Sequence, residues 1–150
     1  MHEYIVNLHA HTVYSDGEGT HDEVAAAALA AGLDAVWITD HNVYVQGLDG
    51  YRYQGDRRVL LLAGEEIHDQ VRQPQKNHLL VIEARRELAP LAAHPQRLVD
   101  AVAEVGGLAF IAHLVDPQAP LFHEPDLSWV DADLQGSFGV EIWNTMSEFK

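Results

Sequence analysis

Two histidines near the start of the chain, His9 and His11, follow a short apolar segment and are separated by one residue. In an extended strand, side chains two residues apart point to the same face, about 6.6 Å apart along the chain. Both imidazoles can therefore face one metal ion. Asp16 follows beside Gly17, so a turn can bring its carboxylate to the same ion or to a neighbouring one. The spacing predicts a metal site, although such a histidine pair also arises by chance or as polar neighbours on a half-buried strand.

Further polar side chains lie at the carboxyl ends of later strand-like segments: His41, Glu66, His113 and Asn144. Taken singly, three of these residues have an ordinary structural explanation. His41 could bond a backbone carbonyl, Glu66 could pair with a nearby arginine, and His113 could cap its strand. Together they favour a shared site, because independent packing would not collect so many ligands at one end of the strands without compensating cations.

The elements that must position these residues begin with a strand over residues 4–8. A helix over residues 20–31 follows, because Thr20 and Glu23 form a capping-box pattern ahead of an alanine-rich run. Residues 33–39 are apolar and β-branched, which predicts a second strand. Strand, helix and strand in this order predict a βαβ unit with parallel strands.

The next segment, residues 42–56, is rich in glycine and tyrosine and predicts a loop, which we expect to form a lid or rim. Strands follow over residues 58–63 and 77–82. The connection between them is shorter than the dozen or so residues that a parallel crossover needs, so these strands should be antiparallel. That pairing brings His78 to the same end of the sheet as Glu66.

The second half of the chain predicts a helix over residues 94–105, strands over 108–112 and 139–143, and a loop with a short helical or irregular piece over 116–134. These elements predict one α/β domain over residues 1–150, with six strands that form most of a barrel. In a barrel built from βα units, the carboxyl ends of the strands converge on one face, where active sites form.

The composition limits the chemistry and the partners. The chain contains no cysteine, so a metal site must use its ten histidines and its carboxylates. Nine Lys and Arg against 23 Asp and Glu give a formal charge of −14, which disfavours nucleic acid and anionic membranes. With no signal-like segment and no run of about 18 apolar residues, we expect a soluble, cytoplasmic protein. We expect the remaining histidines on the surface, with only His68 and His123 near the pocket rim.

Six ordered motifs run through nearly the whole chain: His9-Ala10-His11-Thr12 with Ser15-Asp16-Gly17, Thr39-Asp40-His41, Gly64-Glu65-Glu66-Ile67, His78-Leu79-Leu80, Ala112-His113 and Glu141-Ile142-Trp143-Asn144. Their order and spacing resemble those of the PHP family, the polymerase and histidinol phosphatase superfamily. Proteins of this family fold as distorted (β/α)7 barrels, related to the TIM barrel, and hold a metal cluster that hydrolyses phosphoesters.

The resemblance implies two or three divalent ions, of zinc, manganese or iron, and seven ligands. The first ion would take His9 and His11, the second His78 and His113, the third Asp16 and His41, and Glu66 would bridge the first two.

One motif of the family has no counterpart among the 150 residues. It is an Asp-x-His after a further strand, and it contributes ligands to the first and third ions. We therefore expect an incomplete family domain in which these two ions are weakly held. We also expect an open edge at the strand around residues 140–143, which invites self-association.

These features predict a metal-dependent hydrolase. A hydroxide that bridges two ions about 4 Å apart would attack phosphorus in line, so no side-chain nucleophile is required. We expect a small phosphomonoester or a nucleotide as the substrate, with Arg52 and Asn144 as candidate substrate-binding residues.

Two alternatives remain. One is an exonuclease on single-stranded nucleic acid ends, in which tyrosines could stack bases, although the charge of −14 leaves no basic track for a backbone. The other is a non-catalytic metal-binding accessory or sensing domain, against which the near-complete ligand set argues.

Overall fold

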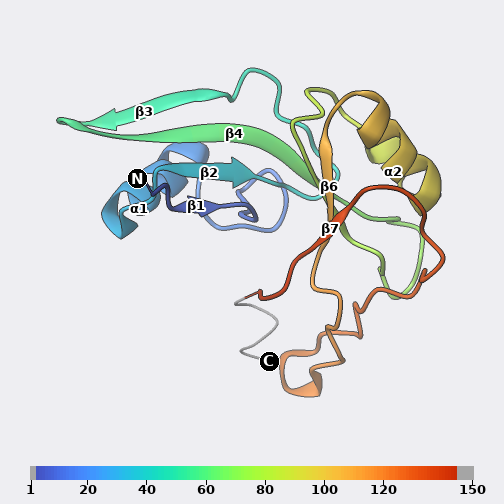
Figure 1. The fold of residues 1–150 in the computed structure, drawn as a ribbon. Coiled ribbons are helices and arrows are strands. Elements are labelled where there is room, and N and C mark those ends of the chain that lie inside the picture. Colours follow the sequence, from blue (N-terminus) through green and yellow to red (C-terminus); the bar gives the residue numbers. More distant parts are fainter. Residues whose placement is uncertain (1–2, 145–150) are drawn as a thin grey trace.

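The strands of the protein form one mixed sheet that curls into half of a barrel (Figure 1). The computed structural model describes residues 3–144. Within these residues the strand order is β1–β2–β4–β5–β6–β7, and β3 pairs with β4 beside this path. The strands are β1 (Val6–Asn7), β2 (Ala35–Ile38), β3 (Gly50–Gln54), β4 (Arg57–Ile67), β5 (Leu79–Ile82), β6 (Leu108–Ile111) and β7 (Gly139–Val140). The helices are α1 (His21–Ala31) and α2 (Pro95–Glu104), with short 3-10 turns at Ala89–Leu91 and Pro120–Phe122.

The predicted βαβ unit is confirmed. β1 and β2 are parallel, and α1 connects them. The capping box also forms, because Glu23 N donates to Thr20 Oγ1 over 3.3 Å and Thr20 N donates to Glu23 Oε2 over 2.8 Å. Gly32 ends the helix with a φ of 79°, a left-handed conformation that glycine adopts at little cost.

The predicted loop over residues 42–56 is wrong in its second part. Gly50–Gln54 forms β3, which makes an antiparallel hairpin with the start of β4. The turn is only two residues long, and Gly55 has the positive φ, 60°, that such a turn favours. A glycine-containing two-residue turn between alternating side chains was the sequence signal for this hairpin.

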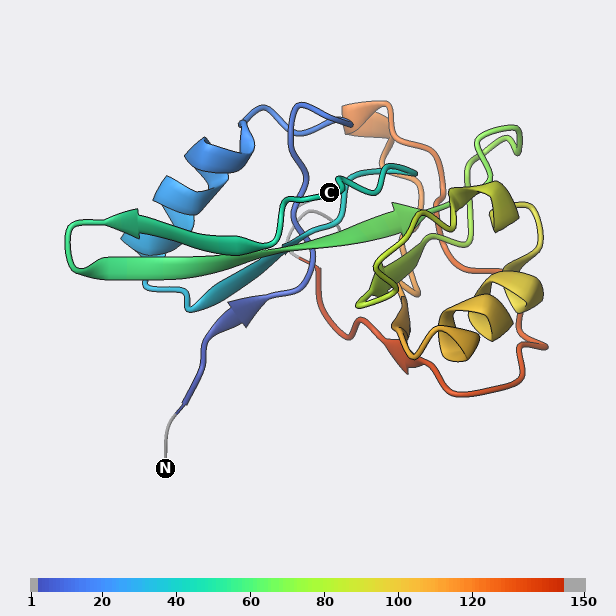
Figure 2. The same ribbon diagram turned by 90° about the horizontal axis from the view of Figure 1, so that it is seen from above.

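β4 is the longest strand and links the two halves of the sheet (Figures 1 and 2). It pairs in parallel with β2 and, as the short connection predicts, antiparallel with β5. β6 is antiparallel to β5, so β6 again runs in the direction of β4. The carboxyl ends of β2, β4 and β6 and the amino end of β5 therefore lie at one end of the sheet.

The two helices cover the outer face of the sheet at different places (Figure 2). Because side chains alternate along a strand, β4 turns its odd-numbered residues toward the helices. Val59 and Leu61 pack in the core under α1, whereas Ile67 packs with Leu98 and Val102 of α2. The even-numbered residues of β4 face the opposite way, and Glu66 among them lines the hollow of the half-barrel.

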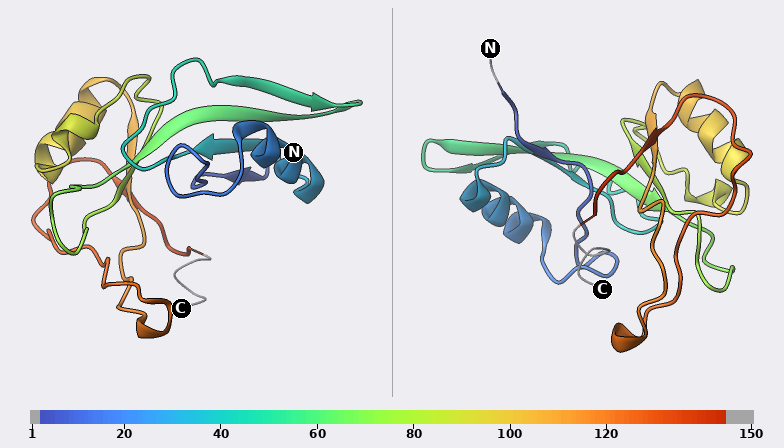
Figure 3. Two further views of the ribbon diagram at one scale, coloured as in Figure 1. Left: turned by 180° about the vertical axis from the view of Figure 1, so that it is seen from behind. Right: turned by 60° about the horizontal axis from the view of Figure 1, so that its bottom comes forward.

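The sheet path ends at β1 on one side and β7 on the other. The segments that leave these two strands come together on the hollow side (Figure 3), where His9 and Glu141 are in contact. Among residues 3–144, no helix is long and apolar enough to span a membrane.

Candidate metal centre

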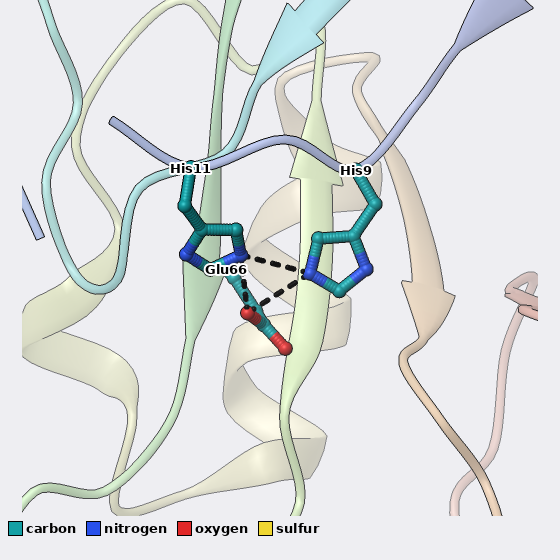
Figure 4. Close-up of side chains that lie close together, drawn as sticks. All are labelled: His9, His11 and Glu66. Atoms are coloured by element: carbon teal, nitrogen blue, oxygen red, sulfur yellow. Dashed lines mark hydrogen bonds and ion pairs between the residues drawn. The ribbon is translucent and has the colours of Figure 1, made fainter. Parts of the chain in front are cut away.

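Glu66 lies at the centre of a ring of histidines. Its side chain is 2% exposed, and its Oε2 lies 3.1 Å from His9 Nε2 and 3.0 Å from His11 Nε2. These two nitrogens are 2.9 Å apart (Figure 4). His41 Nδ1 lies 3.3 Å from the same oxygen. Three imidazole nitrogens thus converge on one carboxylate oxygen, and the predicted common orientation of His9 and His11 is confirmed.

The other oxygen of Glu66 faces a second pair of histidines. His78 Nδ1 lies 3.0 Å from Glu66 Oε1, and His113 Nε2 lies 2.9 Å from it. His78 precedes β5, and its place beside Glu66 follows from the antiparallel pairing of β4 and β5. The predicted convergence of these side chains is confirmed.

Backbone hydrogen bonds beyond the strand ends place His41 beside Glu66. Glu66 N donates to Asp40 O over 3.2 Å, and Asn42 N donates to Glu66 O over 3.1 Å. The segment after β1 is joined to the segment after β2 in the same way, by Thr39 N donating to Ala10 O over 2.8 Å. Backbone hydrogen bonds therefore hold the segments that carry His9, His11 and His41.

Asp16 extends the cluster toward the surface. Its Oδ1 lies 2.9 Å from His11 Nδ1, and its Oδ2 lies 3.4 Å from His41 Nε2. His11 therefore faces Glu66 with one ring nitrogen and Asp16 with the other. Asp16 is the most exposed member, since 66% of its side-chain surface is accessible.

Asp40, for which the sequence predicted no role, holds the turn that carries Asp16. This buried carboxylate accepts hydrogen bonds from Thr12 N and Thr12 Oγ1, both at 2.7 Å, and from Ser15 Oγ at 2.8 Å. Gly17 is required in the same turn, because a Cβ there would lie 2.6 Å from Thr12 N. The motif residues around Asp16 thus serve largely to fix its position.

Three groups of side chains among the described residues could each hold an ion, with ligand atoms within 4.8 Å of one another: His9, His11 and Glu66; His11, Asp16 and His41; His41, Glu66 and His78. The first group and the pair Asp16 and His41 match the sets implied by the resemblance. The third group differs, because His41 rather than His113 accompanies Glu66 and His78.

The donor set fits divalent ions. Within residues 3–144, His78 Nε2 is buried and has no hydrogen-bond partner. Buried polar atoms are rarely left unpaired, so such nitrogens are suited to a ligand. Imidazole and carboxylate groups without thiolates suit zinc, manganese and iron.

The electrostatics of the cluster favour positive charge. Burial opposes ionisation of Glu66, but hydrogen bonds from His11, His113 and His78 outweigh it and hold the pKa of Glu66 well below its usual range. Burial also opposes a charge on His9, yet hydrogen bonds to Glu141 and Glu66 raise the pKa of His9 to about 10. A divalent ion that binds here would replace protons, which is the usual coupling of metal binding to ligand ionisation.

Glu141 is a site residue that the sequence reasoning quoted in a motif but gave no role. Its Oε1 lies 2.9 Å from His9 Nδ1, and its Oε2 accepts a hydrogen bond from His113 N over 2.9 Å. A carboxylate on the far nitrogen of a histidine fixes the orientation of the ring, as is common around metal ions. Asn144 joins this contact, with Nδ2 3.3 Å from His9 Nδ1 and 3.4 Å from Glu141 Oε1.

His68 does not lie on the surface. It is 4% exposed, and its ring stacks on that of His78 with centroids 4.3 Å apart and meets the ring of His41 edge-on at 4.9 Å. The reason is that β4 continues to Ile67, so His68 falls on the same face as Glu66. His123, the other residue expected near the rim, is exposed.

Arg52 is not brought to the histidine cluster. Its register opposite Val59 turns it toward α1, where its Nε lies 3.4 Å from Asp22 Oδ1. Its Nη2 donates to Leu48 O over 3.4 Å. Arg52 is absent from the residues that line the cavity at the cluster, so the structure does not support its predicted contact with substrate.

Comparison with known proteins agrees with the motifs. Residues 7–106 match the family model described as PHP domain. The chain therefore belongs to the PHP domain family, whose members are generally metal-dependent hydrolases. The matched range contains six of the seven predicted ligands, and His113 follows it.

A relative is found in the archaeon Methanocaldococcus jannaschii. The chain is 25% identical over 149 residues to the protein named "Uncharacterized protein MJ1587". The match covers 92% of this chain and 80% of that protein. The similarity therefore extends through both halves of the sheet.

Proposed function

We propose that this protein hydrolyses phosphoesters with two or three divalent ions bound at the cluster around Glu66. The observation that supports this most directly is the division of histidines between the two oxygens of Glu66, as expected of a carboxylate that bridges two ions. We also propose that the half-barrel corresponds to the distorted (β/α)7 barrel of the family.

The proposed ligands keep the assignment implied by the family. His9 and His11 would hold the first ion, His78 and His113 the second, Asp16 and His41 the third, and Glu66 would join the first two. Bound divalent ions supply a Lewis acid for the phosphoryl oxygens and lower the pKa of bound water.

The protein's own residues do the positioning. Glu141 holds the ring of His9 so that Nε2 faces Glu66. Asn144 lies at the same place, and we propose that its amide contacts a phosphoryl oxygen of the substrate. Nδ1 of His9 faces Glu141 and Nδ1 of His11 faces Asp16, so both rings are held on two sides.

The products are inorganic phosphate and an alcohol. The oxygen of water forms a bond to phosphorus, the ester P–O bond breaks, and a proton passes to the leaving oxygen. No side-chain nucleophile is needed in this scheme.

A screen of metal content and phosphatase activity tests the proposal. The purified protein should contain zinc, manganese or iron, should hydrolyse at least one small phosphoester, and should lose that activity with a chelator. Glu66→Gln and Glu65→Gln are matched variants. Each replaces one carboxylate of β4, the first on the face of the cluster and the second on the outer face. Tight metal binding without hydrolysis of any phosphoester would instead support the accessory or sensing domain.

A further inference from the structure

The hollow of the half-barrel is a single cavity of about 1130 Å³ that joins the histidine cluster to an apolar wall. The cluster occupies its polar end. The wall is formed by Leu80 of β5, Phe110 of β6 and, beyond β7, Ile142 and Trp143. The cavity exceeds the size of a small-molecule site, roughly 300–1,000 Å³, so it has room for more than a phosphate group.

Strand register builds this wall. Leu80 of β5 lies opposite Phe110 of β6, and Phe110 lies opposite Gly139 of β7. The ring of Phe110 covers Gly139, where any added side chain would overlap it. Ile142 and Trp143 beyond β7 border the same cavity and are exposed to solvent, at 96% and 63%.

Away from the histidine cluster, the charged side chains that line the cavity are all acidic. No Lys or Arg is among the described residues that line it. Nearby cations are engaged elsewhere, since Lys76 Nζ lies 3.0 Å from Asp126 Oδ1 and Arg52 pairs with Asp22. The lining contains six carboxylates: Asp16, Glu18, Glu66, Asp116, Glu124 and Glu141.

This distribution restricts what the cavity can accept beside a phosphoryl group. With no Lys or Arg in the lining, bound ions would have to attract the phosphoryl group. A second phosphate or a carboxylate that lies away from the histidines would meet acidic and apolar side chains and no Lys or Arg among the described lining residues. Charge repulsion acts strongly in such a partly desolvated site. An apolar group would instead lose water-exposed surface on both itself and the wall.

We propose that the cavity selects phosphomonoesters whose leaving alcohol is apolar and carries no negative charge, such as an arylalkyl alcohol. This inference rests on the proposed function and names its substrate class. Nucleotides with further phosphates and nucleic acid ends are disfavoured by the same features. Burial of roughly 100 Å² of apolar surface predicts a selectivity of at least ~10-fold.

Four esters of one chain length test the preference: the monophosphates of 3-phenylpropanol, propanol, 3-aminopropanol and 4-hydroxybutanoate. Because all four leave as simple alkanols, differences in kcat/KM report binding of the remote group. The phenyl ester should exceed the propyl ester by ~10-fold or more, and the carboxylate ester should be the poorest.

A binding measurement separates the two proposals. Metal-free protein should bind 3-phenylpropanol, measured by isothermal titration, more tightly than propanol. Equal binding of the two alcohols together with hydrolysis of all esters at similar rates would overturn the inference and leave the proposed function intact. Preference for the aminopropyl ester over the phenylpropyl ester would also overturn it, because the carboxylates would then select a cation. Absence of hydrolysis with every metal, while the alcohol still binds, would overturn the proposed function instead.

Two aromatic residues of similar exposure provide matched variants. Trp143 is 63% exposed and lines the cavity, whereas Tyr53 is 67% exposed and lies on the outer hairpin away from it. Trp143→Ala should reduce the phenylpropyl-to-propyl ratio and the affinity for 3-phenylpropanol by several-fold, and Tyr53→Ala should change neither. Phe110→Leu gives a second test that keeps an apolar side chain over Gly139. If both cavity variants retain the parent's selectivity, or if the wall is covered by a second copy at assay concentrations, the inference is wrong.

Discussion

Two adjacent carboxylates on β4 lie in opposite surroundings. Glu66 faces the hollow of the half-barrel, where hydrogen bonds from histidines hold its pKa well below the usual range despite its burial. Glu65 faces the outer side, 1% exposed, where it accepts a hydrogen bond from Leu88 N over 2.9 Å. Burial raises the pKa of Glu65 to about 7. The same side chain, displaced by one residue, is therefore held as an anion on one face and driven toward its neutral form on the other.

The comparison shows how much strand alternation contributes to the site. One register places Glu66 among imidazoles and Glu65 beside the turn that precedes α2. A shift by one residue would exchange the faces and bury the wrong carboxylate in the cavity. The predictions below test this division, beginning with the largest expected effect.

The charge of Glu66 should be needed for metal binding, whereas that of Glu65 should not. Glu66→Gln removes the carboxylate whose two oxygens face the two histidine sets. We expect a loss of metal content and a fall in phosphoesterase activity of more than ~100-fold, because even indirect metal partners contribute ~10–100-fold. Elemental analysis and kcat/KM measure the two effects. Glu65→Gln, made in the same strand, should retain both, and an equal loss in the two variants would contradict the division.

Glu65 should make stability depend on pH in a direction opposite to that of a salt-bridged carboxylate. Burial raises the pKa of Glu65 to about 7 in the folded protein, above its ordinary value of 4.5, so the folded state binds the proton more tightly between these values. Stability should therefore fall as pH rises through this window, by up to about 3 kcal/mol. Glu65→Gln should remove that fall, so that the variant is more stable than the parent near about pH 8 and the difference shrinks toward about pH 5.

Urea unfolding of the metal-free protein and its variants at several pH values measures this effect. Glu104→Gln, at the exposed end of α2, is the matched control and should follow the parent at every pH. A parent whose stability rises relative to Glu65→Gln as pH increases would contradict the raised pKa.

His113 should contribute to activity by binding the second ion. Its Nε2 lies 2.9 Å from Glu66 Oε1, so His113→Ala should lower occupancy of that ion and activity together, by at least ~10–100-fold. Metal titration and kcat/KM provide the measurements. Unchanged metal content with an unchanged rate would show that His113 is only a residue at the end of its strand.

Local sequence signals predicted the strands that bring the histidines together. The βαβ unit, the antiparallel β4–β5 pair and the meeting of His78 with Glu66 follow from hydrophobic runs, a capping box and a short connection. These signals are local, or depend on connection length. The burial of His68 could not be read in the same way, because it depends on β4 continuing past Gly64 to Ile67.

Arg52 shows a second feature that could not be predicted from the sequence, the face of the sheet on which a residue lies. The sequence placed it in a loop beside the predicted pocket, but the hairpin turns it toward α1 and Asp22. Which face a residue takes depends on strand register, and register depends on the two-residue turn at Gly55. Glu141 and Asp40 were missed for a related reason, since their partners lie 132 and 28 residues away in the chain.

Substitution of Glu141 should have the smallest effect on metal binding. Glu141 contacts His9 Nδ1, whereas the nitrogen that faces Glu66 is His9 Nε2. Glu141→Gln keeps an oxygen that can accept from His9 Nδ1, yet removes the charge that holds the ring and His113 N together. We expect metal affinity to weaken by about 10-fold, at the lower end of the range for residues that orient metal ligands. Isothermal titration with Mn²⁺ or Zn²⁺ should show the loss at the site of His9 and His11, while the site of His78 and His113 changes less. Glu141→Ala, which also removes the oxygen, should weaken the same site further. Equal affinities in the parent and both variants would mean that His9 is oriented by Glu66 alone, and that the inner face of β4 needs no support from the segment after β7.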